Sequence, residues 1–364
     1  MSITKEQVLD ALSSVKHPET RENIVESDMI DNLQVEGKKV SFMLRFRKAK
    51  DPFAASMKKT AEAVLKKLDV NIEPEISIFT PPQLIYKPED PLARVKNKIA
   101  VASGKGGVGK STIAVNLAVA LAKSGARVGL IDADVYGPSI PKMFDIEGQR
   151  PEMKKEGDKD IIIPVEKYGV RIVSIGFFVR PEDALVWRGP MATSALKQLI
   201  SQTDWGELDY LLIDLPPGTG DIHLTMVQET AVTGAVIVST PQEVALADVI
   251  KGIAMFTGDK INVPVLGLIE NMSWFTPAEL PDNKYYIFGK EGVKRLAEKM
   301  NVKLLGQIPL VQSVCESGDS GKPTVLEEND MISGAFTELA KNLASAVKER
   351  NENLAPTKKV EIAN

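Results

Sequence analysis

A glycine-rich stretch starting at Gly104, GKGGVGKST, fits the phosphate-loop pattern G-x-x-x-x-G-K-[ST]. A short apolar run, residues 99–102, precedes it and is typical of a buried strand. After the loop, apolar residues recur at helical spacing until Gly125 ends the pattern. Because a strand, a tight loop and a helix follow one another in this order, the stretch is predicted to bind the phosphates of a nucleotide.

The residue types explain how such a loop holds an anion. Glycines let main-chain N–H groups turn toward phosphate oxygens, and a helix starting near Gly109 points its free N–H groups at the same anion. Lys110 can reach the β- and γ-phosphates, and the Ser111 hydroxyl is a ligand for Mg²⁺. The residues predicted to line the nucleotide site are Gly104, Lys105, Gly106, Gly107, Val108, Gly109, Lys110, Ser111 and Thr112.

Composition excludes several other classes of function. The 364 residues are 43% hydrophobic and 26% charged, with a net charge of −4, so nothing indicates a basic nucleic-acid surface. No apolar run is long enough to predict a membrane helix, and the first residues do not resemble a secretory signal. A single cysteine, Cys315, rules out a disulfide within one protomer. We therefore expect a cytoplasmic protein that binds neither nucleic acid nor membranes.

Sequence patterns divide the chain into four parts. Residues 1–80 combine helical spacing with an alternating strand, which predicts a small α+β domain. Residues 81–97 contain four prolines and predict an extended linker, although a structured loop packed on the next domain fits almost as well. Residues 98–350 form the phosphate-loop domain, and the polar residues 351–364 predict a flexible tail.

Short apolar runs alternate with helical patterns throughout the phosphate-loop domain. The expected strands are residues 99–102, 128–131, 172–175, 210–213, 235–238, 265–269 and 304–307. This alternation predicts an α/β fold, with a mostly parallel sheet and helices on both faces. Ligands of such sheets bind at the carboxyl ends of the strands, where the phosphate loop also begins.

Three further segments end strands at this edge. Asp132 and Asp134, in DADVYGPS, can face one Mg²⁺–phosphate site, although a strand-end aspartate can also cap the next helix. Asp214, in LIDLPPGTGD, fits the Walker-B pattern of an acid that holds Mg²⁺. Asn271, in ENMSWF, can read an adenine edge with its amide or form a turn.

Taken together, these motifs resemble the Mrp/ApbC family. The matching segments are GKGGVGKST, DADVYGPS, LIDLPPGTGD, STPQEVALAD, ENMSWF and SGDSGKP. Members are ATP-binding iron–sulfur cluster carriers, within the deviant phosphate-loop ATPases that include MinD and ParA. Residues 1–80 are similar to the iron–sulfur assembly domain fused to some members. The resemblance implies a homodimeric ATPase with ATP and Mg²⁺ as cofactors and iron–sulfur apoproteins as clients.

The resemblance also implies roles for individual residues. Lys105 would act across the dimer on the partner's nucleotide, Asp134 would position the attacking water or Mg²⁺, and Asp214 would support Mg²⁺. Asn271 falls on the adenine-contacting position. The expected catalytic residues are Lys105, Lys110, Asp134 and Asp214, and the expected metal ligands are Ser111, Asp134 and Asp214.

One departure from the family concerns the cluster itself. Many members carry Cys-x-x-Cys shortly after the ENM segment, whereas residues 274–286 of this chain contain no cysteine. In the front domain, Asp51 stands where relatives often have a cysteine. Iron–sulfur clusters need thiolate ligands, and only Cys315 could supply one. Two hypotheses therefore stay open: an ATPase that carries clusters to apoproteins, or an ATP-driven dimer switch or scaffold that holds no cluster.

Overall fold

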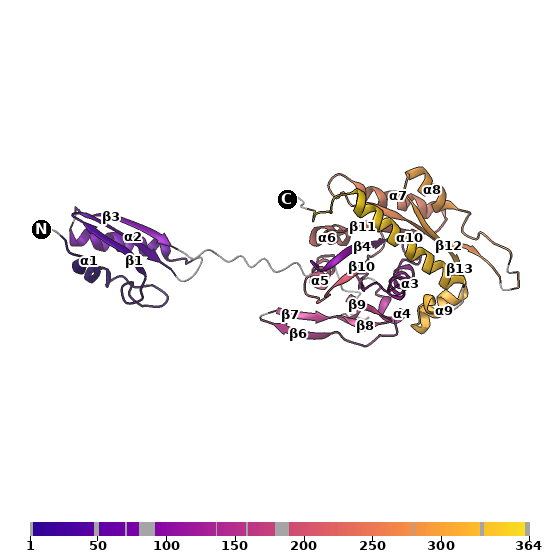
Figure 1. The fold of residues 1–364 in the computed structure, drawn as a ribbon, viewed down its shortest axis with the longest axis horizontal. Helices are drawn as coiled ribbons and strands as arrows, with labels where there is room; N and C mark the ends of the chain where they lie inside the picture. The colour runs from indigo at the N-terminus through magenta and orange to yellow at the C-terminus, as the bar shows by residue number, and fades with distance from the viewer. Residues whose placement is uncertain are drawn as a thin grey trace. The chain divides into compact units, whose positions relative to one another are not determined.

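The computed structural model describes residues 3–46, 51–69, 71–79, 92–135, 137–157, 159–178, 189–277, 279–280, 282–327 and 331–360. The chain forms two compact units, Met1–Lys87 and Pro88–Asn364 (Figure 1). Most of the predicted linker, residues 81–97, lies outside the described residues. Its last three residues, 95–97, already belong to the first strand of the second unit, so that strand begins before the expected domain start at residue 98.

The first unit is a three-stranded sheet packed against two helices. Its elements are α1 (Lys5–Leu12), β1 (Ile30–Glu36), β2 (Lys39–Arg45), α2 (Ala54–Leu68) and β3 (Glu73–Phe79). β2 lies in the middle, antiparallel to β1 and parallel to β3. Every second residue of β2 is buried, because side chains alternate between the helix-covered face and the open face. The helix–strand pattern predicted for this region is confirmed.

His17 and Asp51 form a buried pair in the first unit. The His17 Nδ1 accepts main-chain N–H bonds from Glu19 and Thr20, so its Nε2 carries the proton and donates to Asp51 Oδ2 at 3.0 Å. Phe53 packs edge-on against the imidazole. Asp51 therefore joins the loop after β2 to the loop after α1.

The second unit is a sheet enclosed by helices (Figure 1). Its strands are β4 (Val95–Ala102), β5 (Val128–Asp132), β6 (Glu152–Glu156), β7 (Lys159–Ile163), β8 (Val165–Lys167), β9 (Val170–Ser174), β10 (Leu208–Asp214), β11 (Gly234–Ser239), β12 (Val265–Phe275) and β13 (Leu304–Leu310). Its α-helices are α3 (Lys110–Lys123), α4 (Ile140–Met143), α5 (Gly189–Ser201), α6 (Asp221–Glu229), α7 (Glu243–Thr257), α8 (Gly292–Met300), α9 (Gln312–Ser320) and α10 (Met331–Asn353), with short 3₁₀ turns η1 (Ile175–Phe177) and η3 (Thr324–Leu326).

Eight of the described strands form one sheet in the order β13-β12-β11-β4-β10-β5-β9-β8. All neighbours pair in parallel except β8, which runs antiparallel to β9 at one edge. The seven strands expected from the sequence are each present, as β4, β5, β9, β10, β11, β12 and β13. In the separate β6–β7 hairpin, β6 is polar and exposed, whereas β7 buries Ile162.

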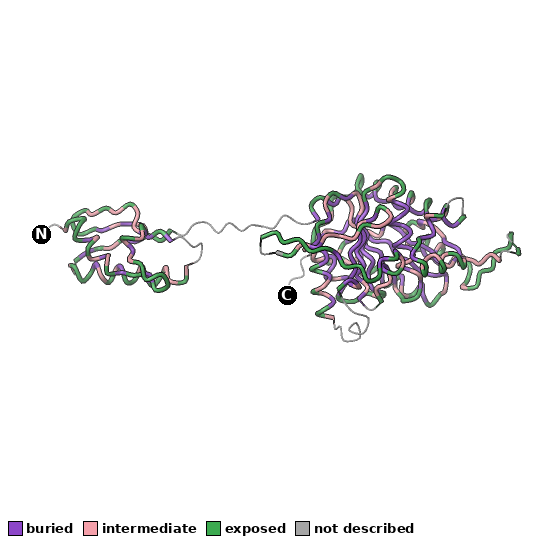
Figure 2. The backbone as a smooth tube through the Cα atoms, turned by 90° about the horizontal axis from the view of Figure 1, so that it is seen from below, coloured by how far each residue is buried: buried purple, intermediate pink, exposed green. Residues whose placement is uncertain are grey.

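A hydrophobic core lies on each face of this sheet. One core contains buried residues of α3, α4 and α10, and the other contains those of α5, α6, α7 and α8. Successive strand residues point to opposite cores, as Ile99 and Val101 do on one side and Ala100 and Ala102 on the other. Figure 2 shows the buried backbone concentrated in the centre of this unit. Strands covered on both faces have continuous apolar sequences, which explains why their positions could be predicted from the sequence.

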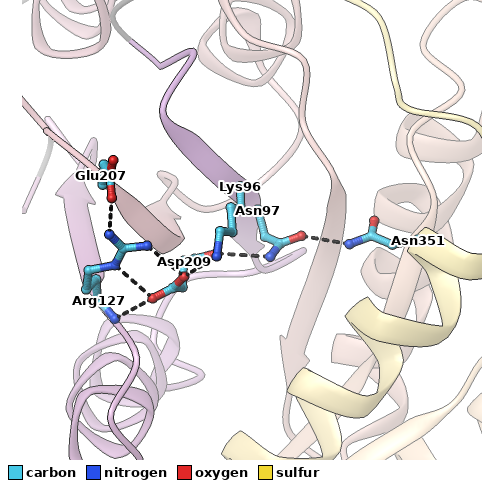
Figure 3. A network of polar contacts seen from close by, with 6 residues as sticks. All are labelled: Lys96, Asn97, Arg127, Glu207, Asp209 and Asn351. Atoms are coloured by element: carbon cyan, nitrogen blue, oxygen red, sulfur yellow. Dashed lines mark hydrogen bonds and ion pairs between the residues drawn. The ribbon is translucent and has the colours of Figure 1, made fainter.

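The amino ends of the strands are held by a polar network, at the edge opposite the phosphate loop (Figure 3). Asp209 accepts bonds from Lys96 Nζ at 2.9 Å and from the main chain and guanidinium of Arg127. Asn97 of β4 donates to the Asp209 carbonyl and accepts a 2.9 Å bond from Asn351 of α10. Charged side chains thus join β4, β5 and β10, and two asparagine amides extend the network to the end of α10.

The C-terminal segment continues from α10 onto this unit. The Thr357 hydroxyl donates to the Val232 carbonyl at 2.6 Å, and the Val360 N–H donates to the Val227 carbonyl at 3.0 Å. Val360 also packs against the core on the α5–α8 face. Up to Val360, this arrangement differs from the flexible tail expected for residues 351–364. The sequence around Val360 is polar, so this single apolar residue gave no signal that the segment packs against the core. Among the described residues, no helix is long and apolar enough to cross a membrane.

Candidate nucleotide-binding site

The phosphate loop connects β4 to α3. Gly107 and Gly109 both have a φ of 80°, a conformation that residues with a Cβ rarely adopt. At Gly104 a Cβ would lie 2.5 Å from the main-chain carbon of Asp248 on α7, so this position also requires glycine. No described side chain caps the first turn of α3, which starts at Lys110. Its N–H groups and positive dipole end therefore face the loop.

Lys110 lies buried at the centre of the site. Its Nζ is 2.7 Å from Asp214 Oδ1, 3.2 Å from Ser111 Oγ and 3.7 Å from Asp134 Oδ2. The Ser111 hydroxyl donates to the second oxygen of Asp214, Oδ2, at 2.6 Å. Thr112 follows in the first turn of α3. The structure thus brings together three expected catalytic residues and all three expected metal ligands.

Burial opposes charge on two aspartates at neighbouring strand ends. Asp214 ends β10 and Asp132 ends β5, and the two are paired in register. Burial raises the pKa of Asp214 above its usual range, although Lys110 and Ser111 act to lower it. Burial, together with the charge of Asp214, raises the pKa of Asp132 to about 7. A cation at this edge would stabilise the ionised form of both carboxylates.

Asp134 is partly buried beside Lys110, on the loop that follows β5. Its main-chain N–H donates to Asp132 Oδ1 at 3.2 Å. Neither aspartate caps the following helix, α4, whose N-cap is Ser139. Of the two interpretations of these acids, their position at the Lys110 cluster favours the one in which they face the phosphate site.

Asn271 lies within β12 and not at its end, since this strand continues to Phe275 instead of stopping near residue 269. Its Nδ2 donates to the Val108 carbonyl at 2.9 Å, and a Cβ on Gly109 would overlap this nitrogen. The next residue, Met272, has a φ of 55°, and the pairing of β12 with β13 is irregular here. The amide therefore supports the phosphate loop, and its contact with adenine stays a prediction.

Lys105 is exposed on the loop, apart from the Lys110 cluster. Its carbonyl accepts a 3.1 Å bond from the Ser103 hydroxyl, and no described carboxylate pairs with its amine. The turn after Asp214 approaches the same loop: Gly218 N–H donates to the Ser103 carbonyl at 2.9 Å. The two lysines of the motif thus occupy different environments: Lys110 is buried and Lys105 is exposed to solvent.

The donor atoms in this cluster suit Mg²⁺. Ser111 Oγ and Asp214 Oδ2 are already neighbours, and hydroxyl and carboxylate oxygens are the hard ligands that this ion prefers. Phosphate-loop enzymes hold the ion with such a Ser/Thr and a strand-end aspartate, together with phosphate oxygens.

No comparable donor set is found for an iron–sulfur cluster in the described part of the chain, where no group of three or more His, Cys, Asp or Glu side chains could hold a metal. Cys315 is exposed on α9, with its Sγ 3.9 Å from Asp319 Oδ2. Glu279 and Asp282, in the cysteine-free segment 274–286, are exposed as well.

Sequence reasoning missed one polar side chain in this site. Ser174, at the end of β9, donates to Asp132 Oδ2 at 2.8 Å. The sequence could have indicated Ser174 through its position at the carboxyl end of a predicted strand, because residues that face the ligand lie at that edge of the sheet.

His223 is buried on α6, where its ring packs against Phe256. Neither of its ring nitrogens has a partner among the described residues. Burial lowers the pKa of this histidine to about 4.

Comparison with known proteins identifies the chain's relatives. A family model described as NUBPL iron-transfer P-loop NTPase matches residues 94–344. The chain belongs to this family. A second model, described as iron-sulfur cluster assembly protein, matches residues 5–77. Both matches confirm the resemblance drawn from the motifs, including the assembly-like front domain.

Two similar proteins carry consistent names. The iron-sulfur cluster carrier protein of Synechocystis is 41% identical over 348 residues, which cover 95% of this chain and 98% of the relative. The iron-sulfur cluster transfer protein NUBPL of Dictyostelium discoideum is 51% identical over 236 residues, or 65% of this chain and 72% of that protein. The names of these relatives support the carrier hypothesis over the scaffold.

Solved structures confirm the fold. A nucleotide-binding protein from Archaeoglobus fulgidus, in complex with ADP, is 37% identical with a TM-score of 0.57, covering 68% of this chain and 96% of that one. The cell-division ATPase MinD of Pyrococcus furiosus is 23% identical with a TM-score of 0.52, covering 68% and 98%, and shows the shared fold alone. The α/β phosphate-loop fold predicted from the sequence is therefore correct.

Proposed function

We propose that this protein binds Mg·ATP on residues 104–112, hydrolyses it slowly and carries iron–sulfur clusters to apoproteins as a homodimer. The observation that carries the proposal is the buried group formed by Lys110, Ser111 and Asp214 next to a glycine loop of the correct geometry. The names of the carrier and transfer relatives supply the cargo.

The residues of the loop bind and orient the triphosphate. Main-chain N–H groups of the glycines and the start of α3 surround the phosphate oxygens. Lys110 exchanges its contact with Asp214 for the β- and γ-phosphates, which leaves the Asp214 carboxylate and the Ser111 hydroxyl to hold Mg²⁺. When bound, Mg²⁺ neutralises charge that develops on the phosphate oxygens.

Two further residues serve the hydrolytic step. Asp134, beside Lys110, orients the attacking water or a water on Mg²⁺. Lys105 is exposed, and in a homodimer its amine is supplied to the partner's phosphates in the manner of an arginine finger acting in trans. Asn271 contributes by fixing the Val108 carbonyl and reads adenine with the rest of its amide.

The deciding experiment measures ATP affinity in Lys110→Ala. Removing a charge-assisted phosphate contact of about 1.5–3 kcal/mol should weaken ATP binding roughly 10- to 150-fold. Lys341→Ala, on the exposed face of α10, is the matched control and should bind ATP as the native protein does. Circular dichroism checks that each variant is folded. Native ATP affinity in a folded Lys110→Ala protein would contradict the assignment.

A further inference from the structure

The Asp132 carboxylate links two loops of the nucleotide site. It is fully buried at the end of β5, yet it forms no ion pair with any described residue. Its Oδ1 accepts from the Asp134 N–H at 3.2 Å, and its Oδ2 accepts from the Ser174 hydroxyl at 2.8 Å. One carboxylate therefore connects the end of β9 with the main chain of Asp134.

The direction of the Ser174 hydroxyl is fixed by its second contact. The Gly176 N–H donates to Ser174 Oγ at 2.9 Å, so the oxygen is already an acceptor on that side. A serine hydroxyl carries one proton, and at Ser174 the available acceptor is Asp132. Since Asp132 and Ser174 are paired in the β5–β9 register, the strand pairing itself sets this geometry.

The main chain at Gly176 lies close to the same loop, since a Cβ placed there would be 3.1 Å from the Cβ of Pro138, which follows Asp134. The corner between β9 and η1 thus bonds to the Asp132 carboxylate and also lies close to the Asp134 loop at Pro138. Asp134 itself extends from this loop to within 3.7 Å of Lys110 Nζ.

We propose that Ser174 is a positioning residue for ATP hydrolysis, which holds Asp134 in place through the Asp132 carboxylate. The proposal rests on the role assigned above to Asp134. Without the Ser174 proton, the Asp132 carboxylate is free to turn, and the Asp134 main chain loses its fixed acceptor. A displacement of about 1 Å in a reacting group can lower a rate about 100-fold.

Ser174→Ala tests the proposal through a split between kcat and KM. We expect kcat for ATP to fall about 10- to 100-fold, because Asp134 is displaced. KM for ATP should stay within about threefold, because Lys110 and the glycine loop are unchanged. Ser333→Ala is the matched control: Ser333 is also buried, and its hydroxyl donates to the Val325 carbonyl on the α10 side. It should lose similar stability but keep native kcat.

A double-mutant cycle separates positioning from a general structural effect. If Ser174 acts through Asp134, Ser174→Ala should cause no further loss of kcat in the Asp134→Ala background. Asp132→Asn provides a second route, should Ser174→Ala fail to fold. It keeps the side-chain volume but offers one acceptor oxygen in place of two, so it should lower kcat by a similar factor.

The outcomes distinguish this proposal from the proposed function. An equal loss of kcat in both backgrounds, or native kcat in folded Ser174→Ala or Asp132→Asn, overturns the positioning role. Native kcat in Asp134→Ala alone contradicts the role of Asp134 itself, and absence of ATP hydrolysis by the native protein contradicts the ATPase proposal. A selective loss of kcat that vanishes in the Asp134→Ala background supports the positioning role.

Discussion

The ion pair between Lys110 and Asp214 shows how much of the site depends on single buried charges. A buried pair is a weak source of net stability, because both ions lose their hydration, but removing one partner leaves an uncompensated charge. In the proposed site, the Lys110 amine is therefore paired with Asp214 until phosphate binds, and this pair must then separate. The same residue also lowers the pKa of His223, after the larger effect of burial.

His223 provides a prediction for stability against pH. Its folded pKa of about 4 lies below the ordinary value of 6.5, so the unfolded chain binds more protons between these values. The native protein should therefore lose stability as the pH falls below about 6.5, by roughly 2 kcal/mol at pH 5 from this group. His223→Leu, which has no titrating group and leaves no unpaired nitrogen, should lack this part of the loss.

The measurement is urea unfolding of both proteins between pH 5 and pH 7.5. The difference in unfolding free energy between His223→Leu and the native protein should grow in favour of the variant as the pH falls. Carboxylates shared by both proteins cancel in this difference. A difference independent of pH would show that His223 is not buried as a neutral group.

At the scale of elements, residues 355–360 form a C-terminal strap that packs against the second unit. It carries the bonds from the Thr357 hydroxyl and the Val360 N–H, and the Asn351–Asn97 bond fixes the end of α10 beside it (Figure 3). Deleting residues 355–364 removes three hydrogen bonds, because the Ala355 carbonyl also accepts a 2.6 Å bond from Arg350, together with one partly buried valine. We expect a loss of about 2–3 kcal/mol in the free energy of unfolding.

The control for this deletion is a chain that ends at Val360, which keeps all the contacts just described. It should unfold at the native urea concentration, whereas the longer deletion should unfold at a lower one. ATP affinity should be native in both, since the strap lies at the edge opposite the phosphate loop. Equal unfolding midpoints for the two deletions would show that the strap adds nothing to stability.

The elements also show which parts of the fold could be predicted. Strands buried on both faces, such as β11, appear as unbroken apolar runs, and the glycine loop fixed the order of β4 and α3. The continuation of β12 past Asn271 could not be read, because ENMSWF is neither apolar nor alternating and contains a residue at positive φ. The strap was missed because its contacts come from one hydroxyl, one main-chain N–H and one valine, which form no pattern within a polar segment.

For the candidate site, the sequence predicted which residues lie at the ligand-binding edge of the sheet, but not which side chains contact one another. Sequence position places Asp134, Asp214 and Asn271 at one edge of a parallel sheet, but it does not give the side-chain partners. That Asp132 turns to Ser174 while Asp214 turns to Lys110 depends on the register of β5 with β9 and β10. Asn271 bonding to Val108 depends on the same kind of long-range packing.

At the scale of the whole molecule, the role proposed for Lys105 in trans predicts a dimer in which each active site uses both chains, and its exposure is consistent with this role. Lys105→Ala should bind ATP almost normally but hydrolyse it poorly. Mixed with Asp134→Ala, it should recover part of the turnover, because one site of the mixed dimer then has both groups intact. ATPase assays across mixing ratios measure this recovery. No recovery at any ratio would indicate that Lys105 acts within one chain.

The last prediction concerns how such a dimer holds its cargo. A bridging [4Fe–4S] cluster usually takes four thiolates, whereas this chain supplies one cysteine per protomer, the exposed Cys315. Carboxylates such as Glu279 and Asp282 are hard ligands that prefer Mg²⁺ or Ca²⁺ over sulfide clusters. We therefore expect the isolated protein to retain no stable cluster after anaerobic reconstitution. Transfer would then be transient, with the missing ligands supplied by a small thiol or by the client protein.

Iron and sulfide counts per dimer, with the thiolate absorption band, decide this point. The expected result is a count close to zero after gel filtration, which rises when a small thiol or an apoprotein client is present. About four irons per dimer, with a band lost in Cys315→Ala, would instead make Cys315 a ligand in place of the usual pair. A cluster that survives Cys315→Ala would refute the argument from ligand softness, because its ligands would then have to be oxygen, nitrogen or an external thiol.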